Sequence, residues 1–179
     1  GKTWSPIGAD REFKGTFDGN GKTISNLSST QFFGYNGTAV TASANNNYVG
    51  FIAKASDATI KNLTISNARI SGGSYVGGIV ANGEDTVIDR CIVDDKSTVV
   101  GYEYVGGIIG AHRWGAGNTT RFTAIVSETD NSAEVGGYKY VGGIAGRVYD
   151  AIIQLCTNNG KVYNAGNNDV TTAGETTCF

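Results

Sequence analysis

The sequence of 179 residues contains no methionine, one proline, one histidine and three cysteines. One histidine and so few cysteines supply neither a clustered zinc site nor a disulfide framework, and we predict no cofactor. The 14 basic and 16 acidic residues give a net charge of −2 without a basic cluster, so we do not expect nucleic acid as a partner. No apolar run approaches the roughly 20 residues of a membrane-spanning helix, so we expect no membrane span in this chain.

Glycine and strand-forming residues are abundant instead. The chain has 27 glycines and is 40% hydrophobic, whereas apolar residues at helical spacing are scarce. This composition predicts an all-β fold in a single domain over residues 1–179. Because the sequence has neither an initiator methionine nor a signal peptide, we expect a processed form or a fragment of a larger parent protein.

The main feature of the sequence is a motif that occurs four times. It reads Tyr-Val-Gly-Phe-Ile from residue 48 and Tyr-Val-Gly-Gly-Ile from residues 75, 104 and 140, so successive copies begin 27, 29 and 36 residues apart. A period of this length is typical of solenoids and repeat arrays. Each unit continues with a turn and two further apolar positions, which predicts three short strands per unit.

Aligning the four units predicts columns of apolar residues inside the fold. The columns are Val49, Val76, Val105 and Val141; Ile52, Ile79, Ile108 and Ile144; and Leu63, Cys91, Ala124 and Cys156. Arg121 falls in an isoleucine column, so we expect Phe122 to turn inward in its place. Two units of ~4.8 Å put Cys91 and Cys156 about 10 Å apart, which is too far for a disulfide. We interpret both as small buried residues, and the redox state of Cys178 stays open.

Units of this length and strand content favour one architecture. A propeller blade needs roughly 40 or more residues and four antiparallel strands, and the leucine-rich pattern is absent. Stacking each unit on the previous one pairs every strand with its copy ~4.8 Å away. We therefore predict a right-handed parallel β-helix of about four full coils plus a partial N-terminal capping coil, with the hand taken from the crossover rule.

The ends of the repeat region differ from its middle. We predict an N-terminal cap and partial coil over residues 1–27, repeats over 48–166, and a degenerate last unit over 167–179. Trp4 and Ile7 are candidates for a lid on the first core layer. Residues 23–27 match residues 59–63, and the Asp-Gly-Asn-Gly run at 18–21 predicts a tight turn.

The repeat resembles a known family. Tyr-Val-Gly-Gly-Ile followed by Ile-x-x-Cys, with residues 158–162 after it, resembles the GLUG-motif repeats of bacterial surface proteins. Residues 4–8 leading to 17–27 look like the usual opening of such regions, and the resemblance covers residues 4–166. It implies a right-handed β-helix on secreted or cell-surface, adhesin-like proteins of the bacterial outer envelope. Similar repeats occur in the non-catalytic part of some immunoglobulin-A metallopeptidases, whose His-Glu-x-x-His motif is missing here.

Aromatic residues supply the candidate binding sites. His112, Arg113 and Trp114 lie in an excursion of the third unit, and a tryptophan between polar and glycine residues either packs back or contacts a ligand. Tyr102 and Tyr138 flank a column of Tyr48, Tyr75, Tyr104 and Tyr140. Such a column either stabilises parallel strands or offers a platform for sugar rings.

Acidic residues recur at one turn of each unit. Asp57, Asp85 and Asp150, with Asn118, either accept hydrogen bonds from their own turns or, as a weak alternative, bind Ca²⁺. No calcium-loop spacing supports the second possibility, so we predict no metal site.

We therefore expect a non-catalytic extracellular module that serves as a stalk or a ligand-binding surface. Its partner would be a glycan or a host or cell-surface protein. The alternative is a fragment of a carbohydrate-active β-helix enzyme, a polysaccharide lyase or glycosidase. Such an enzyme would need two carboxyl groups close together. The candidate pairs are Glu84 and Asp85, Asp94 and Asp95, and Glu128 and Asp130. They fall in turns, so we predict that the chain is not an enzyme.

Overall fold

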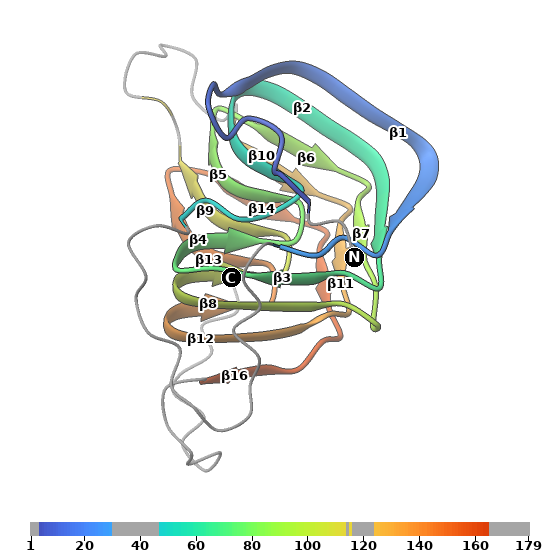
Figure 1. Ribbon diagram of the computed structural model, residues 1–179. Helices are drawn as coiled ribbons and strands as arrows, with labels where there is room; N and C mark the ends of the chain where they lie inside the picture. Colours follow the sequence, from blue (N-terminus) through green and yellow to red (C-terminus); the bar gives the residue numbers. More distant parts are fainter. Residues whose placement is uncertain (1–3, 30–46, 114, 116–123, 165–179) are drawn as a thin grey trace.

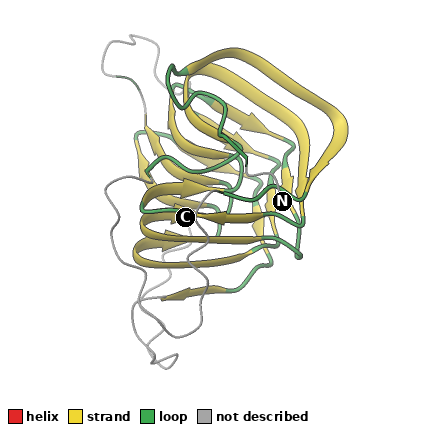
Figure 2. Ribbon diagram, in the orientation of Figure 1, coloured by secondary structure: helices red, strands yellow, loops and turns green. Residues whose placement is uncertain are grey.

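The computed structural model describes residues 4–29, 47–113, 115 and 124–164, and these residues form β-structure without a helix (Figure 2). Accordingly, no helix in the described residues could cross a membrane. The strands are β1 (Phe13–Ser25), β2 (Ile52–Ser66), β3 (Arg69–Ser71), β4 (Ser74–Gly77), β5 (Val80–Glu84), β6 (Val87–Asp89), β7 (Ile92–Val93), β8 (Thr98–Gly106), β9 (Ile109–Arg113), β10 (Ile125–Ser127), β11 (Asp130–Asn131), β12 (Glu134–Gly142), β13 (Ala145–Tyr149), β14 (Ile152–Gln154), β15 (Thr157–Asn158) and β16 (Val162–Asn164).

Two sheets with parallel pairing contain these strands. The 11-stranded sheet has the central order β13-β9-β5-β2-β6-β10-β14, and the 5-stranded sheet has the order β16-β12-β8-β3, with β4 beside β8. Corresponding strands of successive units lie side by side in Figure 1. The fold is therefore all-β and parallel, as predicted, and each unit contributes strands to both sheets.

The pairing register corrects the alignment of the third unit, residues 104–139. Ile88 pairs with Val126, which pairs with Ile153, so Val126 occupies the isoleucine column that Arg121 was predicted to enter. The same register aligns Thr129, and not Ala124, with Cys91. The prediction for Arg121 and Phe122 was therefore wrong about the column, and both residues lie outside the described part.

An insertion explains this error. Glu84 and Val87 are three residues apart, whereas their partners Arg113 and Ile125 are twelve apart, so the third unit carries nine extra residues between β9 and β10. These nine residues account for the longest repeat spacing, 36 in place of 27.

The first unit, residues 48–74, is also shifted by one position. Val49 bridges Val76, but Ile52 pairs with Val80 and not with Ile79. The first unit lacks one of the two glycines, so Phe51 takes the place that isoleucine has in the other units. Phe51 is fully buried, 1% exposed, and its ring packs against the rings of Trp4 and Phe17 in the N-terminal segment.

The N-terminal segment forms one further parallel layer. Thr23, Ile24 and Ser25 pair with Thr64, Ile65 and Ser66, so they match these residues and not residues 59–61 as the alignment predicted. The run at 18–21 is an irregularity within the continuous strand β1 and does not reverse the chain.

Trp4 and Ile7 cover the first core layer. The Trp4 ring stacks on Phe51 with 5.6 Å between ring centroids, and its Nε1 donates to the Phe51 carbonyl at 3.2 Å. Ile7 bridges Ile52. Both side chains pack against the core, as the lid prediction required.

Corners of the chain, some between strands and some within them, are made by residues in the left-handed backbone region. Such residues recur at matching places in successive units, although that region costs a non-glycine residue roughly 1–2 kcal/mol. The columns are Tyr48, Tyr75, Tyr104 and Tyr140; Asp57, Asp85 and Asp150; and Asn20, Asn62, Arg90, Glu128 and Leu155. Aspartate and asparagine are common in this conformation, whereas tyrosine, arginine and leucine are not. Stacking of the layers therefore imposes the left-handed backbone conformation on each corner position, whichever residue occupies it.

Glycines of the repeated motif let the two sides of the core approach each other. A Cβ on Gly107 would lie 2.2 Å from the Gly143 carbonyl oxygen and 2.3 Å from the Asn131 side chain. Asn131 is fully buried, and its amide donates to Asn158 at 2.8 Å. The motif therefore keeps glycine here because no side chain fits.

We expect Gly107→Ala to lower the free energy of unfolding by several kcal/mol, because the added methyl group meets the backbone of the next unit. Gly83→Ala is the matched control, since its Cβ would meet side-chain atoms at 3.0–3.3 Å that can shift. We expect it to cost about 1 kcal/mol or less. Urea unfolding of the two variants compares them, and equal losses would contradict the packing described for Gly107.

Candidate ligand-binding surface

The four motif tyrosines form a continuous stack on the outside of the fold, which we call the tyrosine ladder (Tyr48, Tyr75, Tyr104 and Tyr140). Successive ring centroids are 4.8, 5.0 and 5.1 Å apart. This spacing follows from the strand spacing of ~4.8 Å. All four tyrosines are corner residues with positive φ, so their side chains leave the backbone in the same direction.

Stacking limits what the ladder can bind. The rings of Tyr75 and Tyr104 face a neighbour on both sides, so they present only edges and hydroxyl groups. Tyr140 has one ring neighbour in the ladder and is 59% exposed. The predicted sugar platform therefore cannot extend over the faces of the inner rings.

The structure brings together Tyr102 and Tyr138, both predicted to flank this column. Their rings stack with 5.1 Å between centroids on the paired strands β8 and β12. The Lys139 ammonium lies 5.8 Å from each ring centroid. This pair is a second stack beside the tyrosine ladder.

The predicted group of His112, Arg113 and Trp114 is not a single surface feature. His112 points inward from β9 and is 1% exposed, Arg113 is exposed and pairs with Glu84, and Trp114 lies outside the described residues. Only Arg113 of the three is shown where a ligand could touch it freely.

His112 is held neutral inside the fold. Its Nε2 lies 2.9 Å from the Thr86 carbonyl, which can only accept, so Nε2 carries the proton. Its Nδ1 is buried and has no hydrogen-bond partner among the described residues. Burial lowers the pKa of His112 to about 4, although the hydrogen bond to Thr86 and the charge of Asp85 oppose this shift.

A groove of about 430 Å³ runs between the tyrosine ladder and the outer face of β5, β9 and β13. Its lining residues are Tyr48, Tyr75, Asn82, Ala111, His112, Arg113, Arg147 and Tyr149. Asn82, Ala111 and Arg147 occupy one pairing column, and Arg113 and Tyr149 occupy the next outward column. Ala111 has the shortest side chain of its column, so it forms part of the floor.

Sequence reasoning missed Asn82, Arg147 and Tyr149. They stand at outward positions where the units differ from one another, and a search for shared residues passes over such positions. Comparing the residues three and five places after the isoleucine of each Gly-Gly-Ile motif would have revealed this polar and aromatic strip.

Two of the corner aspartates interact with other residues of the chain. Asp57 pairs with Lys14 at 3.3 Å, and Asp85 accepts a hydrogen bond from the Gly115 amide at 3.1 Å. Within the described residues, no three histidine, cysteine or acidic side chains are placed to hold a metal ion. The weak calcium assignment for Asp57, Asp85 and Asp150 therefore finds no support.

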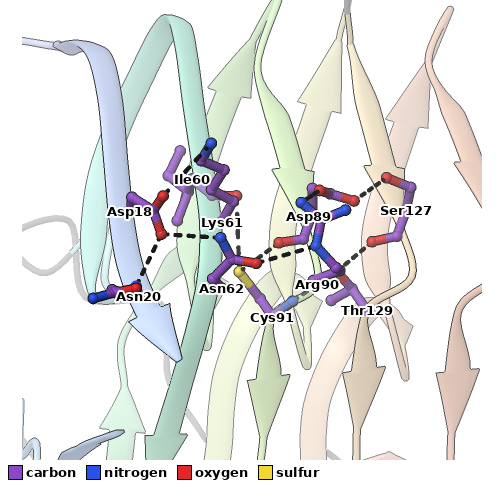
Figure 3. A network of polar contacts seen from close by, with 10 residues as sticks. All are labelled: Asp18, Asn20, Ile60, Lys61, Asn62, Asp89, Arg90, Cys91, Ser127 and Thr129. Atoms are coloured by element: carbon purple, nitrogen blue, oxygen red, sulfur yellow. Dashed lines mark hydrogen bonds and ion pairs between the residues drawn. The ribbon is translucent and has the colours of Figure 1, made fainter. Parts of the chain in front are cut away.

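A polar network ties the N-terminal layer to the units that follow (Figure 3). Asn62 donates to Asp18 at 3.0 Å and accepts from Arg90 Nε at 3.1 Å. Arg90 pairs with Asp89 at 2.7 Å, and Asp89 accepts from Ser127 at 2.9 Å. The side-chain hydrogen bond from Asn62, together with the Asn20 amide, lowers the pKa of the Asp18 carboxyl. The network crosses four layers and has a structural role.

The two described cysteines are unpaired thiols in one column, separated by Thr129. Cys91 is fully buried, its amide donates to Thr129 Oγ1 at 3.2 Å, and burial raises the pKa of its thiol to about 11. Cys156 is half-buried, and burial also raises its pKa. Neither thiol has the lowered pKa of a reactive nucleophile.

Two of the carboxylates considered for catalysis, those of Glu84 and Asp94, have partners within the fold. Glu84 pairs with Arg113. Partial burial alone would raise the pKa of Asp94, but hydrogen bonds from Ser66, Ser97 and the amides of Asn67 and Lys96 outweigh it and lower the pKa. A general acid needs a raised pKa, so Asp94 is unsuited to that role.

Comparison with known proteins gives one similarity. The chain is 32% identical over 117 residues to Halomucin of Haloquadratum walsbyi, and the aligned residues make up 62% of this chain and 1% of that protein's length. No protein-family model matches the chain, and no solved structure matches it.

The neutral state of His112 predicts a pH dependence of stability. Its pKa is lower in the folded than in the unfolded state, so its contribution is present above pH 6.5 and is lost as the pH falls toward 4. The loss is roughly 3 kcal/mol. We expect His112→Val, which copies Val148 of the same column, to remove this part of the pH dependence. Urea unfolding between pH 7 and 4 measures it, and parallel curves for both proteins would refute the assignment.

Stacking on both faces predicts that Tyr75 contributes more stability than Tyr140. We expect Tyr75→Asn to lower the free energy of unfolding by about 1 kcal/mol more than Tyr140→Asn, because an aromatic pair adds ~0.5–1.5 kcal/mol beyond its buried area. Asparagine tolerates the left-handed backbone, so corner strain is not the variable. Thermal and urea unfolding compare the variants, and a larger loss for Tyr140→Asn would count against the ladder as a stabilising stack.

Proposed function

We propose that this chain is a non-catalytic extracellular module, built as a right-handed parallel β-helix of the GLUG-repeat type, that presents a ligand-binding surface. The groove beside the tyrosine ladder carries this proposal. Apart from the buried His112, it is formed by outward residues of successive units, and none of its lining residues is acidic. A pair of carboxyl groups, which glycoside cleavage needs, is therefore missing from its lining.

The proposed location is the cell surface or the medium, as part of a larger protein. The similarity to Halomucin, a protein named as a mucin, supports it. The chain matches only 1% of that protein's length, so nothing else about Halomucin is carried over.

The proposed partner is a glycan or a cell-surface protein that carries one. Tyrosine hydroxyls, the Asn82 amide and exposed cations are groups that bind sugar hydroxyls and acids, and the 61% exposed ring of Tyr149 offers a face for a sugar ring. An adhesive role follows if the same surface is repeated along a longer protein.

A glycan array tests the proposal on three forms of the chain: wild type, Tyr149→Ala and Leu155→Ala. Leu155 is 76% exposed in the same unit but does not line the groove, so it is the matched control. We expect wild type and Leu155→Ala to bind the same glycans and Tyr149→Ala to lose at least tenfold in affinity, about the effect of removing a stacked aromatic contact.

Two results would count against the proposal. Absence of binding to any glycan would remove the ligand-binding role and leave a spacer. New reducing ends released from a bound glycan would favour the alternative, a carbohydrate-active enzyme.

A further inference from the structure

The groove carries more positive than negative side chains. Arg113 and Arg147 line it, and Lys54 lies beside it against Tyr48, whereas the nearest carboxylate partner is Glu84. This excess stands out in a chain of net charge −2. The corner residues Asp85 and Asp150 follow the ends of β5 and β13 and bound the positive strip on that side.

Two of these cations are available to an anion. Lys54 Nζ lies 5.0 Å from the Tyr48 ring centroid, and the Arg147 guanidinium lies 5.3 Å from that of Tyr104. Among the described residues neither forms an ion pair with a carboxylate. A cation held beside an aromatic ring is oriented by it while its N–H groups stay open to another partner.

The arrangement suits an extended ligand better than a single ion. Lys54, Asn82, Ala111 and Arg147 follow one another in a single pairing column that crosses all four units. Neighbours in this column are ~4.8 Å apart, so the backbone positions of Lys54 and Arg147 stand about 14 Å from each other. Between them lie the low Ala111 and the Asn82 amide, and the open ring of Tyr149 stands in the next column.

We infer that the groove binds an acidic polysaccharide that lies along the stacked units, with its carboxylate or sulfate groups on Arg147 and Lys54. This inference rests on the proposed glycan-binding function. Guanidinium groups bind carboxylate and sulfate through paired hydrogen bonds, and the tyrosine edges and Asn82 take the sugar hydroxyls. Duplex nucleic acid requires a longer basic surface than this strip provides.

The test uses the 179-residue chain in affinity electrophoresis through gels that contain polygalacturonate, dextran sulfate or neutral dextran. We expect retardation by a polyanion and none by dextran, with high salt weakening it. Stronger retardation by polygalacturonate would indicate that the groove prefers carboxylate groups, and stronger retardation by dextran sulfate would indicate that it prefers sulfate groups. Arg147→Gln should weaken binding about tenfold, the loss of one charged hydrogen-bonded contact. Lys22→Gln is the control, because it removes the same charge from an exposed position in β1, away from the groove.

Several results would overturn the inference. Equal weakening by Lys22→Gln and Arg147→Gln would show a net-charge effect, and equal retardation by duplex DNA would show a general polyanion surface. Failure to bind either polyanion, with neutral glycans still bound on the array through Tyr149, would remove the acidic ligand and leave the proposed function standing. Failure in both assays would remove both. Unfolding midpoints equal to wild type show that the variants are folded.

Discussion

Parallel pairing of each unit with the same residues of the next is the constraint on which the rest of this structure depends. It makes every corner recur at one place, so Leu155 and Arg90 adopt the left-handed backbone that Asn62 adopts with less strain. It also sets the ~4.8 Å spacing that turns the motif tyrosines into a stack. Strain at one corner is offset by the hydrogen bonds and core contacts that stacking provides along the whole layer.

The inward and outward positions of the units differ in how much their residues vary from unit to unit. Inward columns repeat apolar residues, as Ile60, Ile88, Val126 and Ile153 do, because each must fit its neighbours above and below. Outward columns on β5, β9 and β13 vary between units, and the groove is built between them and the unvarying tyrosine ladder. In the proposed function, residues that the repeat does not share would set the ligand preference, on a scaffold built by the shared residues.

The sequence predicted the parallel all-β arrangement and the lid formed by Trp4, because the motif and its period carry that information. It misplaced the third unit, since a nine-residue insertion after β9 cannot be located from spacing alone when Arg121 falls by chance at an isoleucine position. It did not predict tyrosine at a left-handed corner, because such a conformation is imposed by neighbouring layers and not by local preference. For the same reason His112 looked like a loop residue, although the register buries it.

The most direct test of this account is a methyl-detected nuclear Overhauser spectrum of the chain, read for the column Ile60, Ile88, Val126 and Ile153. The account predicts contacts between Ile60 and Ile88, between Ile88 and Val126 and between Val126 and Ile153. It predicts none between Ile60 and Val126, which stand two layers and about 10 Å apart. Contacts that link Ile88 to a different residue of the third unit would contradict the register on which both the tyrosine ladder and the groove depend.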